Sequence, residues 1–144
     1  MNEIIARGNI QVGQHAATWE EAIRVAAAPL LERGSIECGY VDRMIASVHE
    51  LGPYMVIMPG FALAHAAPGP DVRASELSVA TFDDDIAFNS ANDPVRVVMC
   101  LACKDSTAHI ARLQNVAEKL LEDGFLDQML ACGNEEALYQ LVNA

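Results

Sequence analysis

The stretch VRVVMCLA, residues 95–102, is apolar at every position except Arg96. A strand exposed on one face alternates apolar and polar side chains, whereas a strand covered on both faces is apolar nearly throughout. Residues 95–102 therefore predict a central strand of a sheet.

Shorter extended segments precede this strand, and each is bounded by residues that break regular structure. Pro59-Gly60 ends the first segment, and His65 ends the second, shortly before a run rich in proline. The three aspartates at residues 83–85 predict a turn between the last two segments. The predicted strands before the central one span residues 54–58, 61–64, 76–82 and 86–88.

Helical patterns flank this block of strands. Thr18-Trp19-Glu20-Glu21 matches a capping box and starts the first helix, which Gly34 is expected to end. A second helix is expected to end at Gly52-Pro53. This order predicts one α/β domain, residues 1–144, in which helices pack on a sheet. The three helices expected after the central strand begin near Ser106, lie around residues 125–130 and start at Asn134.

Charge and apolar run length exclude several classes of protein. The chain of 144 residues carries a net charge of -11, which would repel a polyanion, so no nucleic-acid partner is expected. The apolar runs are too short for a membrane-spanning helix, and residues 1–7 do not resemble a secretory signal. The expected location is the cytoplasm.

Two of the four cysteines, Cys100 and Cys103, form a C-x-x-C spacing. Redox pairs of this kind usually lie at a helix N-terminus, whereas a separation of three on a strand sends the side chains to opposite faces. We interpret both as small buried apolar residues. A disulfide or zinc site is the less favoured interpretation, because no second C-x-x-C is present.

His65 differs from the other three histidines in its surroundings. It lies between Pro59-Gly60 and Pro68-Gly69-Pro70, and its immediate neighbours are alanines. Small neighbours leave an imidazole accessible to another macromolecule, and a strand end offers a backbone carbonyl that can set its tautomer. This context favours a nucleophilic histidine, although a histidine in a turn could equally be structural.

His109 falls in the first turn of the helix expected from near Ser106. The unpaired N–H groups and the positive end of a helix favour phosphate at that place. The alternative is a histidine at the edge of the core that satisfies a backbone carbonyl. His15 is interpreted as a bystander. His49 lies near the end of the second helix, where an imidazole can interact favourably with the helix C-terminus.

Other site patterns are absent from the sequence. There is no GxxxxGK[ST] phosphate loop, no Rossmann glycine fingerprint, no GxSxG elbow and no HExxH pair. The aspartates at 83–85 lack further cation ligands at suitable spacing. These chemistries are therefore less favoured than a nucleophilic histidine.

The segment GPYMVIMPGFALAHA, residues 52–66, resembles the active-site segment of enzyme IIA proteins of the mannitol/fructose superfamily. These proteins belong to the bacterial sugar phosphotransferase system, and the pattern is most similar to the ascorbate-type branch. Residues 92–95 and 105–109 also resemble that branch. The similarity implies a three-layer α/β/α sandwich with a mixed central sheet.

The resemblance also implies a two-step phosphoryl relay without a metal or organic cofactor. His65 would accept the group at Nε2 from the phosphohistidine of the small carrier HPr. It would then pass the group to a cysteine of a IIB protein or domain, which energises a membrane IIC transporter. The expected substrate is ascorbate or a related pentitol-like compound. His109 would help to hold the phosphoryl group. A homodimer is compatible with this interpretation.

Two features depart from the family pattern. Ala64 stands where the family commonly has proline before the histidine. Mannitol-type members carry an active-site arginine on the second helix, where this chain offers His49, with Arg43 further away. Two alternatives stay open: a regulatory protein that binds targets under control of His65 phosphorylation, as in the nitrogen branch, and a metal-binding domain that uses His65 and His109.

Overall fold

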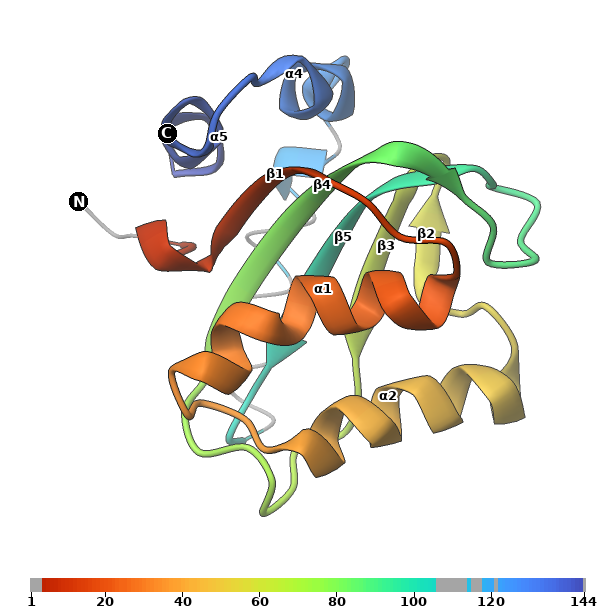
Figure 1. Cartoon of the computed structure of the whole chain (residues 1–144), viewed down its shortest axis with the longest axis vertical. Helices are drawn as coiled ribbons and strands as arrows, with labels where there is room; N and C mark the ends of the chain where they lie inside the picture. The colour runs from red at the N-terminus through yellow and green to blue at the C-terminus, as the bar shows by residue number, and fades with distance from the viewer. Residues whose placement is uncertain (1–3, 106–113, 115–117, 121, 144) are drawn as a thin grey trace.

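The computed structural model describes residues 4–105, 114, 118–120 and 122–143, and its central feature is a five-stranded sheet (Figure 1). The strands lie in the order β1-β4-β5-β3-β2. The predicted central strand at residues 95–102 is confirmed in its bounds and in its place in the middle of the sheet. The strands are β1 Ile10–Gln14, β2 Val56–Met58, β3 Phe61–His65, β4 Glu76–Ile86 and β5 Val95–Ala102.

The sheet is mixed, as expected. Strand β5 pairs antiparallel with β4 and parallel with β3. The two outer strands complete the sheet, with β1 parallel to β4 and β2 antiparallel to β3. Every residue of β5 except Arg96 is buried, because helices cover the sheet on both sides.

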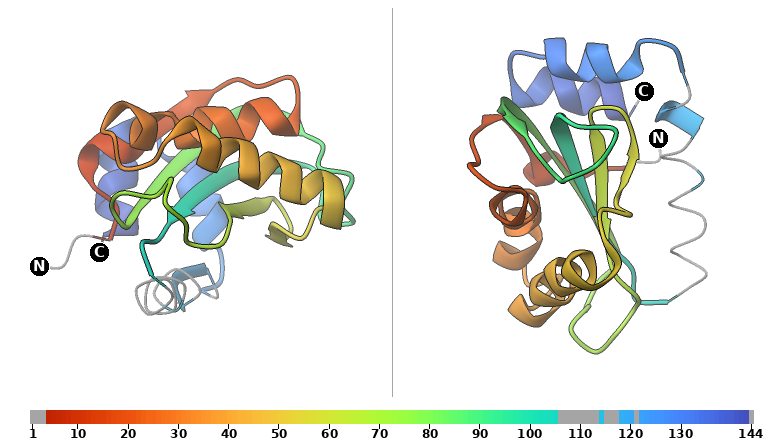
Figure 2. Two further views of the ribbon diagram at one scale, coloured as in Figure 1. Left: turned by 90° about the horizontal axis from the view of Figure 1, so that it is seen from below. Right: turned by 90° about the vertical axis from the view of Figure 1, so that its right-hand side faces the viewer.

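Helices lie on the two faces of the sheet (Figure 2). Along β3, Ala62 and Ala64 belong to the core beneath α1 and α2, whereas Phe61 and Leu63 belong to the core beneath α4 and α5. The predicted three-layer α/β/α arrangement is therefore confirmed. The helices are α1 Trp19–Glu32, α2 Cys38–Leu51, α4 Phe125–Ala131 and α5 Glu135–Val142, with a short 3-10 helix η1 at Arg7–Asn9.

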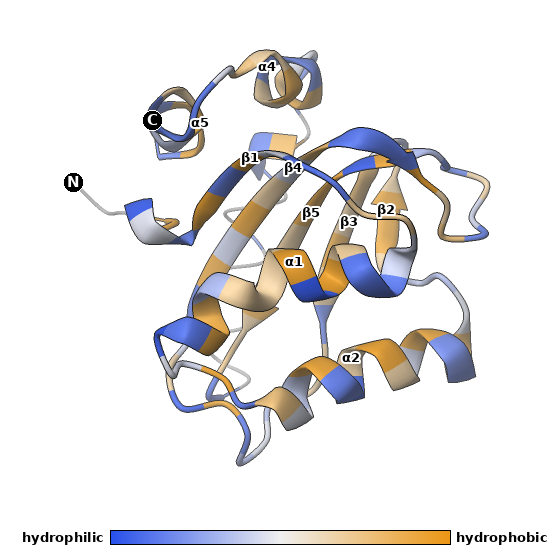
Figure 3. Ribbon diagram, in the orientation of Figure 1, coloured by the Kyte–Doolittle hydropathy of each residue, from blue (hydrophilic) through white to orange (hydrophobic). Residues whose placement is uncertain are grey.

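The hydropathy of the chain follows these layers (Figure 3). Strands β3 and β5 are largely apolar, while α1 and α2 alternate between apolar and polar stretches. This alternation lets each helix bury one side against the sheet and expose the other. Among the described residues, no helix combines the length and the apolar character that would let it span a membrane.

The helix ends follow the predicted signals. Thr18 Oγ1 accepts a 3.2 Å hydrogen bond from the N–H of Glu21. The Glu21 carboxylate accepts a 3.0 Å hydrogen bond from the N–H of Ala17. In the usual capping box the donor is the N–H of the cap residue itself, here Thr18. Gly34 and Gly52 follow α1 and α2 with φ of +76° and +88°, a conformation that favours glycine. Asn134 caps α5 through its side chain, as expected.

The prediction of a turn at residues 83–85 is wrong. Strand β4 continues through the three aspartates to Ile86, so residues 86–88 are not a separate returning strand. The pairing of β4 with β5 shifts register between Thr81 and Ile86. The acidic run therefore lies on an irregular strand end rather than in a turn.

Distant partners of these carboxylates explain the longer strand. Asp84 Oδ2 accepts a 3.0 Å hydrogen bond from the N–H of Ala16 and lies 3.1 Å from Nδ1 of His15. The Nε of Arg96 donates a 2.7 Å hydrogen bond to Asp85. These partners come from the segment after β1 and from β5. The end of β4 is therefore hydrogen-bonded on both of its sides.

Strand β1 was not predicted from the sequence. Its residues, IQVGQ, include two glutamines and a glycine, which are not typical of a strand. The strand lies at the edge of the sheet, parallel to β4, and the N–H of Gly13 donates a 3.1 Å hydrogen bond to Thr81 Oγ1. Pairing on one side only lets a polar segment serve as a strand there.

Cys100 and Cys103 face opposite sides of the sheet. Cys100 belongs to the core beneath α1 and α2, and Cys103 to the core beneath α4 and α5. Both side chains are buried. The interpretation of this C-x-x-C as two small core residues is confirmed.

Candidate functional site

His65 is the last residue of β3 and pairs with Leu101 of β5. Its side chain is half-buried, and its Nδ1 lies 2.7 Å from the carbonyl oxygen of Leu63. A carbonyl oxygen can only accept, so Nδ1 carries the proton of this hydrogen bond. The lone pair of the neutral ring then lies on Nε2. The carbonyl expected near the strand end to set the tautomer is thus present.

Tyr54 contacts both the backbone and the ring of His65. Its hydroxyl donates a 3.2 Å hydrogen bond to the carbonyl oxygen of His65. The two rings meet edge to face, with centroids 5.4 Å apart and planes at 89°. Tyr54 is 38% exposed, so it forms part of the surface beside His65.

Tyr40 holds the chain directly after His65. Its hydroxyl accepts a 3.0 Å hydrogen bond from the N–H of Ala66 and donates one of 2.7 Å to the carbonyl oxygen of Leu101. Its side chain extends from α2 into the core and is fully buried. Burial raises the pKa of Tyr40, so the hydroxyl remains a neutral group that can donate and accept at once.

Arg43 lies one turn after Tyr40 on α2 and holds the following part of the loop. Its Nη2 donates a 2.9 Å hydrogen bond to the carbonyl oxygen of Ala67. The guanidinium also donates two hydrogen bonds, of 2.8 and 2.7 Å, to Asp71. The hydrogen bond from Arg43 lowers the pKa of Asp71, and the same bond raises the pKa of Arg43. The positive charge of Arg43 is therefore engaged by a carboxylate.

These contacts bear on both departures from the family pattern. Ala64 is fully buried within β3. The hydrogen bonds that the side chains of Tyr40 and Arg43 make with this loop involve the residues after His65 rather than those before it. Of the two α2 residues considered for the arginine role, only Arg43 contacts that loop in the described part of the chain. His49 faces α1 instead, with Nε2 3.3 Å from a Glu20 carboxylate oxygen and its ring 4.9 Å from that of Trp19.

His109, the second residue predicted for the site, lies outside the described residues. No sequence pattern predicted a role at the site for Tyr40, Tyr54 or Asp71. The apolar pattern of α2 makes Tyr40 look like an ordinary core residue. One signal was available: positions three apart on a helix, such as Tyr40 and Arg43, present their side chains to the same region.

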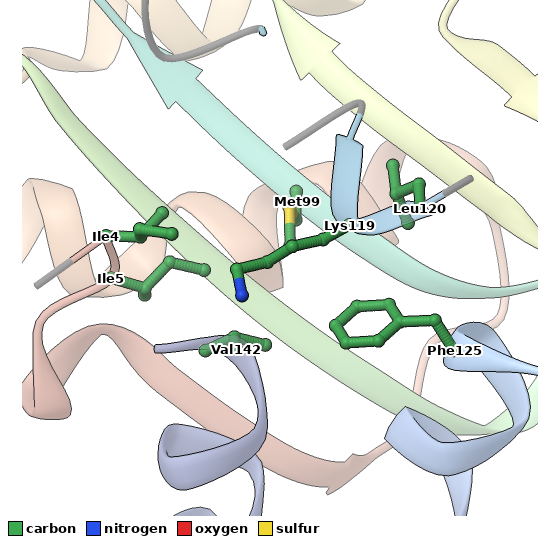
Figure 4. Close-up of a pocket in the computed structure, with 7 residues that line it drawn as sticks. All are labelled: Ile4, Ile5, Met99, Lys119, Leu120, Phe125 and Val142. Atoms are coloured by element: carbon green, nitrogen blue, oxygen red, sulfur yellow. The ribbon is translucent and has the colours of Figure 1, made fainter. Parts of the chain in front are cut away.

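A small cavity lies between the sheet and the C-terminal helices (Figure 4). The volume that the centre of a water molecule can occupy in this cavity is about 10 Å³, which is near the minimum for holding one water. This cavity is too small for a substrate and belongs to the packing of the core. Its lining residues are Ile4, Ile5, Met99, Lys119, Leu120, Phe125 and Val142.

Two curated phosphotransferase system proteins are similar to this chain over most of its length. One similar protein is the putative phosphotransferase IIA component SgcA of Escherichia coli K12, 32% identical over 93% of this chain and 94% of that protein. Another is the ascorbate-specific phosphotransferase system EIIA component of the same strain, 30% identical over 94% of this chain and 89% of that protein.

Solved structures show the same fold. The solution structure of the mannitol-specific cryptic phosphotransferase enzyme IIA CmtB from E. coli has a TM-score of 0.90 at 26% identity, and 99% of each chain is covered. The mannitol enzyme IIA of E. coli, solved in complex with phosphorylated enzyme IIB, has a TM-score of 0.82 at 22% identity, with 96% of each chain covered. The latter similarity supports the fold alone.

A family model also matches nearly the whole chain. It is described as phosphoenolpyruvate-dependent sugar phosphotransferase system, EIIA 2, and it covers residues 3–144. Members of this family transfer phosphate within the sugar phosphotransferase system. The chain therefore belongs to the EIIA 2 family of the phosphoenolpyruvate-dependent sugar phosphotransferase system and is a phosphotransferase component of that system.

Proposed function

We propose that His65 carries the phosphoryl group of this EIIA component. The observation that supports this assignment is the 2.7 Å hydrogen bond between Nδ1 of His65 and the carbonyl oxygen of Leu63. It leaves the lone pair of the neutral imidazole on Nε2, which is the atom that must attack phosphorus. The half-buried ring at a strand end is also within reach of a protein partner.

The first transfer takes the group from the phosphohistidine of HPr. The Nε2 lone pair of His65 forms a bond to phosphorus while the N–P bond of the donor breaks and its electron pair returns to the donor ring. The Nδ1 proton stays hydrogen-bonded to Leu63 and stabilises the positive charge that the ring gains.

The second transfer passes the group to a cysteine of a cognate IIB protein or domain. The thiolate attacks phosphorus, the N–P bond breaks, and neutral His65 is restored. The E. coli mannitol enzyme IIA, which shares this fold, forms a complex with phosphorylated enzyme IIB, so the fold is compatible with a IIB partner. The IIB would in turn energise a membrane IIC transporter.

One experiment tests the assignment of His65. The protein is incubated with enzyme I, HPr and phosphoenolpyruvate, and its intact mass is measured with and without acid treatment. We expect one acid-labile phosphate on the wild-type protein and none on His65→Ala. Undiminished labelling of His65→Ala would overturn the assignment.

We propose ascorbate as the transported substrate, supported by the ascorbate-specific relative at 30% identity. Purified phosphorylated protein is offered to the IIB of an ascorbate system and, as the matched control, to the IIB of a mannitol system. We expect faster transfer to the ascorbate IIB. Faster transfer to the mannitol IIB would contradict the substrate but leave the relay intact.

A further inference from the structure

The peptide unit that joins His65 to Ala66 is held at both ends by tyrosine hydroxyls. Tyr54 donates a 3.2 Å hydrogen bond to its carbonyl oxygen, and its N–H donates one of 3.0 Å to Tyr40. A peptide unit is planar, so hydrogen bonds at its two ends set the orientation of the whole plane. The backbone that carries the His65 side chain is thereby fixed.

The Tyr40 hydroxyl is itself a fixed point. It donates a 2.7 Å hydrogen bond to the carbonyl oxygen of Leu101, the residue that pairs with His65 in the neighbouring strand. The ring of Tyr40 is fully buried, and the guanidinium of Arg43 lies 5.2 Å from its centroid. The hydroxyl therefore ties the first residue after β3 to the central strand β5.

Tyr54 acts on the other end of the peptide and on the ring. Its own ring meets the imidazole edge to face at 5.4 Å while its hydroxyl reaches the His65 carbonyl. Rotation of the imidazole is then limited by the Leu63 carbonyl at Nδ1 and by the Tyr54 ring. Together these contacts restrict both the backbone and the side chain of His65.

We propose that Tyr40 and Tyr54 are positioning residues for phosphoryl transfer at His65. This inference rests on the proposed function of His65 as the phosphoryl acceptor. The two hydroxyls act on the peptide after His65 and hold Nε2 in line for attack on phosphorus. Because transfer depends on alignment of the attacking and leaving atoms, a loosened imidazole lowers the rate of the chemical step.

Tyr54→Phe is the sharpest test, because it removes one hydroxyl and keeps the aromatic ring. We expect kcat for transfer from phosphorylated HPr to fall about three- to tenfold, which is the effect of losing one neutral hydrogen bond. KM for phosphorylated HPr and the melting temperature should be unchanged. Tyr40→Phe should lower kcat at least as much, with a lower melting temperature because its hydroxyl is buried.

Tyr139→Phe is the matched control. It removes the hydroxyl of the one remaining tyrosine, which lies on α5 over the β1 side of the sheet, at the opposite end from β3. We expect kcat and KM of this variant to match those of the wild-type protein. A loss of kcat equal to that of Tyr54→Phe would show a general effect of tyrosine removal and overturn the proposal.

Nitrogen NMR of the imidazole supplies a readout that stability alone does not move. In the wild-type protein the His65 ring should be the Nδ1–H tautomer, because Nδ1 donates to Leu63. In Tyr54→Phe we expect the ¹⁵N shifts of this ring to move toward a mixture of the two neutral tautomers. Unchanged ring shifts together with unchanged kcat would overturn the proposal.

The two proposals fail in distinguishable ways. A change in KM alone in Tyr54→Phe would assign Tyr54 to partner contact and overturn its positioning role. Labelling of His65→Ala at the wild-type level would instead overturn the proposed function. If His65→Ala takes no phosphate while Tyr54→Phe has wild-type kcat, only the positioning role is overturned.

Discussion

Arg43 and Asp71 form an ion pair with two hydrogen bonds across the loop that follows His65. Arg43 Nε lies 2.8 Å from Asp71 Oδ2, and Nη2 lies 2.7 Å from Oδ1. Nη2 also donates to the carbonyl oxygen of Ala67. One arginine of α2 thus connects both ends of this loop, and its contribution to stability can be measured.

Asp71→Asn should lower the free energy of unfolding by about 1 kcal/mol near neutral pH, because it removes one charge of a partly exposed, two-hydrogen-bond pair. In a chain of this size that loss corresponds to a fall in melting temperature of about 2–4 °C. Urea unfolding followed by circular dichroism measures the difference. A variant as stable as the wild-type protein would contradict a stabilising role for the pair.

The stability difference between Asp71→Asn and the wild type should depend on pH. Arg43 lowers the pKa of Asp71 in the folded protein, so the stabilisation is complete above the ordinary aspartate pKa, about 3.9. It is lost as the pH falls through the lower folded pKa, where the carboxylate takes up a proton. Urea unfolding should therefore show the difference shrinking below about pH 4. A difference that stays constant down to the acid limit of folding would contradict this prediction.

Gly69→Ala should destabilise the protein through the same ion pair. A Cβ at this position would lie 2.9 Å from Nη2 of Arg43 and 3.2 Å from Oδ1 of Asp71. Because Arg43 is held by three hydrogen bonds, it cannot move aside without weakening them, at a cost of about 1–2 kcal/mol. The matched control is Gly133→Ala, where a Cβ would meet nothing within 4 Å. Equal melting temperatures for the two variants would show that the loop yields freely.

Cys38 should be alkylated faster than Cys100 in the native protein, because Cys38 is exposed and Cys100 is buried. Burial raises the pKa of Cys100 to about 12, so the reactive thiolate is scarce at neutral pH and the sulfur is also inaccessible. N-ethylmaleimide should label exposed Cys38 in the native protein and Cys100 only after denaturation in guanidinium chloride. Peptide mapping by mass spectrometry reads the sites. Native labelling of Cys100 as fast as Cys38 would contradict the packing described for β5.

His109→Ala should slow phosphoryl transfer while some phosphorylation is retained. The sequence predicts a helix from near Ser106 with His109 in its first turn, where an imidazole N–H and the helix end would stabilise the phosphoryl group. Rapid-quench measurement of transfer from phosphorylated HPr gives the rate, with His15→Ala as the control at a histidine that pairs with Asp84. Wild-type kinetics in His109→Ala would remove this residue from the site.

The sequence by itself determined the central strand, most helix ends and the family. The apolar run of β5, the cap at Thr18 and the glycines after α1 and α2 act through neighbours a few positions away, so a local pattern is sufficient to predict them. The segment at residues 52–66 carried the resemblance that the family match over residues 3–144 confirmed.

Only the tertiary structure decided how His65 is surrounded and where β1 and the end of β4 lie. Tyr40 reaches Ala66 across 26 positions, and the strand end at Asp84 depends on a residue 68 positions away. A hydrogen bond requires two groups within about 3.5 Å, and folding alone brings such distant groups together. In the sequence, Tyr40 on the apolar face of α2 therefore looks like any core residue. Its hydrogen bonds with Ala66 and Leu101 exist only in the folded protein.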